Sequence, residues 1–292
     1  MSKPKYAVVV VHGIGVGTGD ERKGFSDELK AGVVKYNPEC GKFWFEAPWE
    51  GLNDLVDGVV KKAADELFNS YIRDADAKNR RAEKLISKID VNSGWLCWKW
   101  CKKGSVWLLT KIFGAMPVVL RKAKRITPNA LDAVLDLPIY LGEKAAEIRG
   151  TVTTKIDEAM KTGVDGIVLV GHSLGSVIAF DVLREELSQK HADSRINALV
   201  TLGSPVEWVA KIRHALENGT GIPSFEIQGV KWINYYDPQD PVPLRRELNS
   251  NMFKGVENVS EVSGEILIDA HCAYWKSPRI AKRISALMNE GA

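Results

Sequence analysis

The chain has little cysteine and no sign of a secretory leader. Its 292 residues include four cysteines, too few to imply a disulfide framework. Cys97 and Cys101 are four residues apart, but no second Cys/His pair lies nearby, so we expect no zinc site and no other metal. Residues 1–5 run straight into an apolar strand without the hydrophobic core of a signal peptide. These features predict a cytoplasmic protein with reduced thiols.

Acidic residues are missing from one long stretch. None lies between Asp90 and Asp132, where eight basic residues occur: Lys99, Lys102, Lys103, Lys111, Arg121, Lys122, Lys124 and Arg125. This stretch carries +8 in a chain of net charge +3, so the remaining residues sum to −5. Such a basic segment on a mildly acidic body is an asymmetry that a function could use.

The glycine-rich segment 13–19 lacks the marks of a nucleotide site. Its glycines do not follow the dinucleotide-binding spacing, and the segment contains no Gly-Lys-Ser/Thr. We therefore expect no nucleotide or other organic cofactor. Hydrophobic residues at 45% and charged residues at 26% are typical of a globular protein and argue against a disordered or fibrous chain.

Apolar runs alternate with helical patterns along most of the chain. The predicted strands are residues 6–11, 43–47, 166–170, 196–202 and 230–236, with a short sixth strand at 265–268. Continuous β-branched runs such as YAVVVV are typical of strands buried on both faces. Helical patterns cover residues 20–36, the segment after Ser173, and 277–289. The alternation predicts an α/β fold, with a mostly parallel sheet flanked by helices.

Residues from about 50 to 142 break this alternation. They contain helical patterns at 52–72 and 76–89 but no convincing strand. We interpret them as a helical cap or lid inserted into a single domain that otherwise spans residues 1–292.

Ser173 lies in the pattern Gly171-His172-Ser173-Leu174-Gly175, between a predicted strand and a predicted helix. A strand before this pattern and a helix after it are the surroundings of a nucleophilic serine that is exposed on a sharp strand-to-helix turn. Glycines flank the serine because larger side chains would clash, and the helix N-terminus directs amide groups at developing negative charge. The alternative is a tight turn with an incidental serine.

A serine hydroxyl needs a base, and the chain has histidines at positions 12, 172, 191, 214 and 271. In this type of fold the acid and then the histidine follow the serine. His191 and His214 lie too close after Ser173 to leave room for an intervening strand and acid loop. His271 follows the last predicted strand and is the predicted base.

The predicted strand 230–236 runs into Asp237-Pro-Gln-Asp240-Pro-Val-Pro, so both aspartates are candidates for the acid. Each precedes a proline, which restricts the aspartate to extended backbone and would hold its carboxylate in place. The acid would orient His271 and stabilise the imidazolium. An aspartate that is not used for this would cap the turn.

An oxyanion hole needs two backbone N–H donors. The residue after the nucleophile, Leu174, supplies one. The loop after the first strand, His12-Gly13-Ile14-Gly15, supplies the other, and we assign it to Ile14, with Gly13 allowing a close backbone approach.

These segments together resemble the lipase and serine-esterase branch of the α/β-hydrolases. VVVVHGIG resembles that branch's first strand and oxyanion loop, LVGHSLGS its nucleophile turn, TLGSP the next strand, NYYDPQDPVP its acid loop and AHCAYW its histidine loop. The resemblance covers about residues 6–49 and 140–290. It implies the α/β-hydrolase fold, the triad Ser173–Asp240–His271, with Asp240 favoured over Asp237, and oxyanion amides at Ile14 and Leu174.

The predicted function is cleavage of carboxylic esters, including lipid or phospholipid acyl esters, through an acyl-enzyme. An acyltransferase would use the same triad, and a non-catalytic lipid-surface protein could keep the fold. Four of the nine tryptophans lie in residues 95–120, beside the basic residues. Residues 95–125 therefore predict either a packed cap helix with a solvated basic face or a peripheral contact with an anionic membrane; we expect no nucleic-acid partner.

Overall fold

The computed structural model describes residues 5–13, 24–47, 140, 145–187, 195–216, 224–240, 242–243, 247–265 and 268–290. Nearly all of them belong to one compact unit, Met1–Glu50 with Ala146–Ala292. Apart from residue 140, the predicted cap at about 50–142, with its basic segment 95–125, lies outside the described residues, so its assignment stays a prediction. None of the helices in the described ranges has the length and apolar character needed to cross a membrane.

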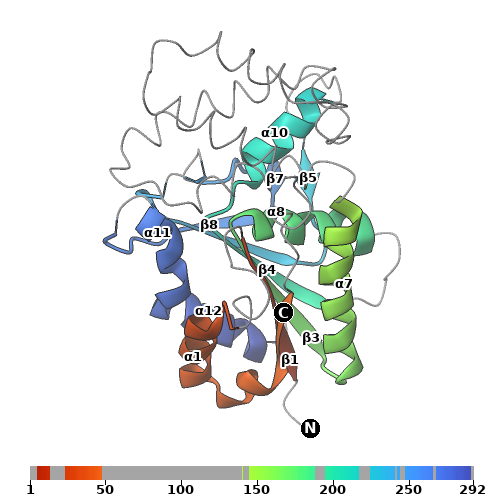
Figure 1. Ribbon diagram of the computed structural model, residues 1–292, viewed down its shortest axis with the longest axis vertical. Helices are drawn as coiled ribbons and strands as arrows, with labels where there is room; N and C mark the ends of the chain where they lie inside the picture. The colour runs from red at the N-terminus through yellow and green to blue at the C-terminus, as the bar shows by residue number, and fades with distance from the viewer. Residues whose placement is uncertain are drawn as a thin grey trace, which may run out of the picture. The chain divides into compact units, whose positions relative to one another are not determined.

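A six-stranded parallel sheet forms the centre of this unit (Figure 1). Its strands are β1 (Tyr6–Val11), β2 (Trp44–Ala47), β3 (Gly166–His172), β4 (Ile196–Leu202), β6 (Lys231–Tyr236) and β8 (Val256–Ser260). They lie in the order β2-β1-β3-β4-β6-β8, and every pair is parallel. The short strands β5 (Phe225–Glu226) and β7 (Phe253–Lys254) pair in a separate small sheet. The predicted α/β fold with a parallel sheet is confirmed.

Five of the six predicted strands match observed strands to within two residues at either end. The sixth prediction, a strand at 265–268, is wrong. Glu265 has no regular structure, and Ile268 begins the helix α11 (Ile268–Ala273). The sixth strand is β8 instead, at the edge of the sheet, where most of its residues are half-buried. Its sequence VENVS is too polar to give a clear strand pattern.

Valines and isoleucines on the central strands build the core. The row Val10–Val170–Val200–Ile233 crosses four neighbouring strands, and none of its members is exposed. Burying each of these side chains contributes about 1.5–3 kcal/mol. The row packs in one cluster with residues of α1 (Asp27–Tyr36) and α12 (Pro278–Glu290). These two helices therefore cover one face of the sheet.

The remaining helices are α7 (Ala145–Lys161), α8 (Leu174–Asp181), which continues into the π-helical turn η5 (Val182–Leu187), and α10 (Val206–Leu216), with the 3₁₀ segments η2 (Pro38–Phe43) and η6 (Tyr274–Lys276). All eight residues of α8 are buried. Figure 1 shows α7 on the opposite side of the sheet from α1 and α12. The sheet is thus covered on both faces, as a parallel sheet requires.

The carboxyl ends of the parallel strands lie at one edge of the sheet. The segments that leave β1, β3, β4 and β6 at this edge begin at His12, Ser173, Gly203 and Asp237. Ligands of open α/β sheets bind at this kind of edge. The topology therefore brings four sequence segments with candidate functional residues to one place.

Candidate active site

Ser173 occupies a strained turn between β3 and α8. Its φ of 53° and ψ of −130° make it the one non-glycine residue with positive φ among those the structure describes. Such a conformation costs of order 1–3 kcal/mol and persists only where the surrounding structure imposes it. This is the geometry that the predicted nucleophile turn requires.

The two glycines of the motif allow the backbone to pass close to its neighbours. A Cβ atom on Gly175 would lie 2.2 Å from the His12 carbonyl oxygen and 2.4 Å from that of Val11. A Cβ atom on Gly171 would lie 2.5 Å from the Cα atom of Ser176. The start of α8 is therefore pressed against the end of β1 at Gly175 and against the end of β3 at Gly171, and a side chain at either position would force the segments apart.

The first-strand loop reaches Ser173, as predicted for an oxyanion loop. A Cβ atom on Gly13 would lie 2.5 Å from Ser173 Cβ and 3.2 Å from Ser173 Oγ. Leu174 is the first residue of α8, so its N–H has no acceptor within the helix and is available at the turn. Ile14 lies outside the described residues, and its assignment stays a prediction.

His271 and Asp240 form a buried pair. His271 Nδ1 lies 2.8 Å from Asp240 Oδ2, with side-chain exposures of 7% and 0%. Because a carboxylate only accepts hydrogen bonds, Nδ1 carries the proton and donates it. The neutral imidazole then keeps its lone pair on Nε2, which is the form that a general base needs.

Three donors hold the Asp240 carboxylate. Besides His271, the Tyr274 hydroxyl donates to Oδ2 at 2.9 Å and the Val242 N–H donates to Oδ1 at 2.9 Å. Burial works to raise the pKa of Asp240, but the charge of His271 and these hydrogen bonds outweigh it and hold the pKa below its ordinary value. Asp240 therefore stays ionised beside the imidazole.

Asp237 has a different role in the same loop. Its Oδ1 accepts the Gln239 N–H at 2.8 Å, and its Oδ2 accepts the N–H and the hydroxyl of Ser263 at 2.8 and 2.6 Å. Among the described residues its carboxylate makes no hydrogen bond with His271; it caps its own turn and holds the segment after β8. Of the two aspartates that the sequence left open, the structure places Asp240 against the histidine.

His172 lies against His271 on the side of the nucleophile. The two rings are 4.5 Å apart between centroids, and His172 Nε2 donates to the His271 carbonyl oxygen at 2.8 Å. Burial, and next the charge that His271 can carry, lower the pKa of His172 from 6.5 to about 3. His172 is therefore a neutral donor that fixes the backbone of His271.

Gly203 lies between β4 and the acid–histidine pair. A Cβ atom there would be 2.7 Å from Asp240 Oδ2 and 2.9 Å from His271 Nδ1, and the Ser173 N–H donates to the neighbouring Leu202 carbonyl at 3.0 Å. The main chain of Ser173 and the pair thus both lie at the end of β4. No hydrogen bond joins Ser173 Oγ to His271 within the described residues.

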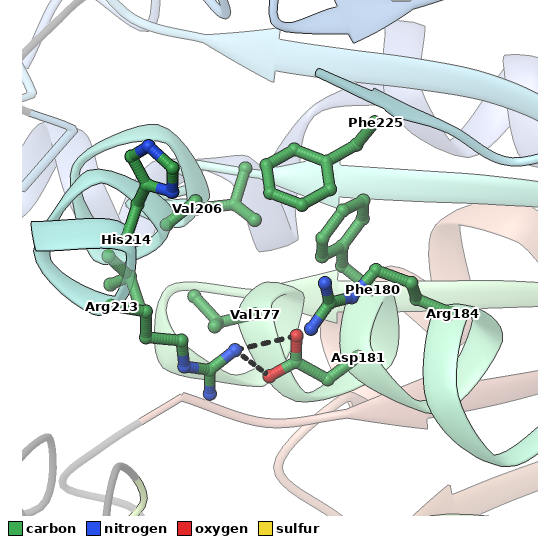
Figure 2. A pocket seen from close by; sticks show the side chains of 10 residues that line it. Val177, Phe180, Asp181, Arg184, Val206, Arg213, His214 and Phe225 are labelled. Atoms are coloured by element: carbon green, nitrogen blue, oxygen red, sulfur yellow. Dashed lines mark hydrogen bonds and ion pairs between the residues drawn. The ribbon is translucent and has the colours of Figure 1, made fainter. Parts of the chain in front are cut away.

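Two further histidines, His12 and His214, lie among the described residues. His12 is buried and packs edge-on against Phe25 at 5.0 Å between centroids. His214 lines a cavity of about 110 Å³ between α8, η5, α10 and β5 (Figure 2). In this cavity Arg213 of α10 pairs with the buried Asp181 of α8, with nitrogen-to-oxygen distances of 2.6 and 2.8 Å. None of Ser173, Asp240 and His271 lines it. His191 is outside the described residues.

Sequence reasoning missed the parts played by Tyr274 and His172. Both contacts join segments that are far apart in the chain, since Tyr274 meets the acid loop 34 residues earlier and His172 meets the histidine loop 99 residues later. A signal for Tyr274 was present in its spacing, three residues after His271, which places both side chains on one side of a helical turn.

Metal-ligating side chains do not gather anywhere in the described ranges: no group of three or more His, Cys, Asp or Glu residues there could hold a metal ion. The chemistry open to Ser173, His271 and Asp240 is nucleophilic attack by a hydroxyl with a base beside it.

Residues 145–239 match the family model described as Lecithin:cholesterol acyltransferase. The matched segment runs from α7 to the loop after β6; it includes Ser173 and Asp237 and ends one residue before Asp240. A search of curated proteins finds no match. One solved structure, titled "RedJ with PEG molecule bound in the active site", is 12% identical and covers 48% of this chain and 68% of its own, with a TM-score of 0.32. Similarity this low says nothing about activity.

The parallel sheet, the serine turn after β3, the aspartate after β6 and the histidine before the last helix are arranged as in the α/β-hydrolase fold. The resemblance to the lipase-like branch of that fold is supported over residues 145–239, which are similar to the lecithin:cholesterol acyltransferase family.

The close approach at Gly175 gives a stability prediction. Gly175→Ala should lower the free energy of unfolding by about 3 kcal/mol, because the added methyl group has no space between the start of α8 and the end of β1. Gly150→Ala is the matched control. Gly150 lies within α7 and has nothing within 4 Å of its Cβ position, so this substitution should raise the free energy of unfolding by about 0.5–1 kcal/mol. Urea unfolding measures both. Equal midpoints for the two variants would contradict the packing described for the turn.

Proposed function

We propose that this protein is a serine hydrolase that cleaves carboxylic esters, with lipid acyl esters as its substrate class. Ser173 is the proposed nucleophile, His271 the base and Asp240 the residue that orients His271. The observation that carries the proposal is the strained turn at Ser173, at the same sheet edge as a buried His271–Asp240 pair. The similarity of residues 145–239 to the lecithin:cholesterol acyltransferase family supports a lipid ester as substrate.

The first half of the proposed reaction forms an acyl-enzyme. Ser173 Oγ attacks the ester carbonyl carbon while His271 Nε2 takes the hydroxyl proton. The carbonyl oxygen becomes an oxyanion, which the N–H of Leu174 at the start of α8 stabilises, together with a second donor assigned to Ile14. The tetrahedral intermediate then collapses, and His271 gives its proton to the departing alcohol.

The second half returns the enzyme to its first state. Water attacks the acyl carbon as His271 accepts one of its protons, and the acid leaves when His271 returns a proton to Ser173 Oγ. Throughout, Asp240 remains ionised, which its lowered pKa supports, and it stabilises the imidazolium without taking the proton itself.

A second candidate is acyl transfer, in which an alcohol replaces water in the second half. The observation that favours it is the family match, whose description names an acyltransferase. With a lipid ester donor and increasing amounts of a sterol or other lipid alcohol, an acyltransferase should form the new ester at the expense of free acid. Free acid at an undiminished rate, with no new ester, would leave hydrolysis as the activity.

The expected cytoplasmic location and the contact of residues 95–125 with anionic membranes stay part of this proposal. The +8 charge of the acid-free stretch beside its tryptophans supports the contact. Flotation with anionic vesicles should retain the protein and should lose a variant whose basic residues in 95–125 are changed to Ser; equal flotation of the two would argue against the contact.

Labelling with a fluorophosphonate probe gives the first test of the enzyme. The folded protein should label because the probe traps an activated serine, and Ser173→Ala should not label at all. Ser204→Ala is a suitable control, since Ser204 is also buried at this sheet edge but lies after β4 without the strained backbone of Ser173. Absence of labelling in folded wild type, or labelling that survives in Ser173→Ala, would leave the non-catalytic alternative.

The two aspartates give the second test. Asp240→Asn should lower kcat on a chromogenic ester by about 1,000-fold or more, because the amide no longer fixes the required tautomer of His271. Asp237→Asn should lower kcat by less than about tenfold, since its carboxylate holds Gln239 and Ser263 rather than His271. A larger loss of kcat in Asp237→Asn than in Asp240→Asn would show that the loop rearranges and that Asp237 is the acid.

A further inference from the structure

Tyr274 is the third member of the acid–histidine cluster. It opens η6, directly after α11, and is 1% exposed. Its oxygen lies 2.7 Å from the Asp237 backbone nitrogen and 2.9 Å from Asp240 Oδ2. A backbone N–H can only donate and a carboxylate can only accept, so the single phenolic proton points to Asp240.

We propose that Tyr274 is a positioning residue: its hydroxyl locks the Asp240 carboxylate in the orientation from which Oδ2 accepts the His271 Nδ1 proton. This inference rests on the proposed function, for which Asp240 must orient His271.

The geometry leaves the carboxylate no freedom to rotate. The Val242 N–H holds Oδ1, while Tyr274 and His271 both donate to Oδ2. His271 and Tyr274 are three residues apart on consecutive helical segments, so one turn carries both donors to the same oxygen. Without the Tyr274 hydroxyl, Oδ2 would be held only by the imidazole that it has to orient.

Tyr274 also fixes the acid loop to the histidine segment through its backbone contact. The Asp237 N–H that it accepts stands at the start of the turn whose last residue is Asp240, and the Asp240 N–H donates to the Asp237 carbonyl at 3.0 Å. The phenol oxygen therefore contacts both ends of this turn: the backbone N–H of Asp237 at its start and the side chain of Asp240 at its end.

The hydroxyl acts as a donor and not as a proton carrier. Burial, and next the negative charge of Asp240, raise the pKa of Tyr274 above its ordinary value. It thus stays protonated at neutral pH. Its effect on the reaction must come through the position and the charge of Asp240.

Other titratable groups face the pair and could contribute to any pH dependence. They are His172 from β3, packed on the His271 ring, and Cys272 from α11, whose thiol pKa is raised by burial and next by Asp269 and Asp240. Each of these groups is unchanged in the variants below, so a change in the pH profile belongs to Tyr274.

Tyr274→Phe removes the hydroxyl and keeps the ring. In the full-length chain we expect kcat on a chromogenic ester to fall about tenfold while KM stays within about twofold, because the ester itself does not contact Tyr274. The acid limb of the kcat/KM profile should move to higher pH by about half a unit, since Oδ2 has lost a donor and holds the imidazole proton more strongly.

Tyr235→Phe is the matched control. Tyr235 is 2% exposed and loses the same oxygen atom from the interior, but its hydroxyl makes no hydrogen bond within the described residues. Its kcat should stay within about twofold of wild type and its acid limb should not move. Wild-type kinetics in Tyr274→Phe, or the same change in both variants, would overturn the inference.

A second variant, expected to shift the acid limb in the opposite direction, keeps the inference testable if Tyr274→Phe does not fold. When 3-fluorotyrosine is placed at position 274, the more acidic phenol donates more strongly, so the acid limb should move to lower pH. A shift to higher pH, or no shift in folded protein, would overturn the inference.

Proton NMR separates this inference from the proposed function, because it needs no turnover. The low-field Nδ1 proton of His271 should change its chemical shift in Tyr274→Phe and not in Tyr235→Phe. If wild type fails to label at Ser173 while this resonance responds, the proposed function is wrong but Tyr274 does control the Asp240–His271 hydrogen bond. An unchanged resonance in an active enzyme would overturn the inference alone.

Discussion

The turn at Ser173 depends on how tightly the chain packs where β3 passes into α8. The helix starts so close to the end of β1 that only glycine fits at position 175, and Ser173 is forced to a φ of 53°. The core supplies the energy that holds this strain, because β1 and β3 are buried at every position and β4 at all but one, through residues such as Val10, Val170 and Val200. The result is a serine whose side chain cannot relax into the helix or the strand.

A second group of contacts positions His271, and these contacts come from segments that are distant from His271 in the sequence. His172 holds the His271 backbone, and Gly203 leaves room for the imidazole and the carboxylate at the end of β4. Asp240, itself held by Tyr274 and Val242, accepts the proton of the ring at Nδ1. The site is thus assembled from the ends of β3, β4 and β6 together with the helix α11 that carries His271.

Much of this could be predicted from the sequence because it depends on local patterns. The strand runs 6–11 and 196–202 and the glycines around Ser173 report burial and a close backbone approach directly. The strand predicted at 265–268 was wrong for a physical reason: Glu-Ile-Leu-Ile is as apolar as a strand, but it leads into the short helix that carries His271. The real edge strand β8 has only partly buried residues, so its pattern is weak. The contacts of Tyr274 and His172 join distant segments, and no local pattern reports them.

The acid could not be chosen between Asp237 and Asp240 from the residues themselves. Both precede a proline and both follow the same strand, so residue type and neighbours do not separate them. The partners of their second carboxylate oxygens do. Each aspartate uses Oδ1 to accept the N–H two residues later. Asp237 Oδ2 accepts from Ser263, whereas Asp240 Oδ2 accepts from His271 and Tyr274. Tyr274 accepts the backbone N–H of Asp237 and donates to the carboxylate of Asp240, so it connects the start of this turn to the residue that orients His271.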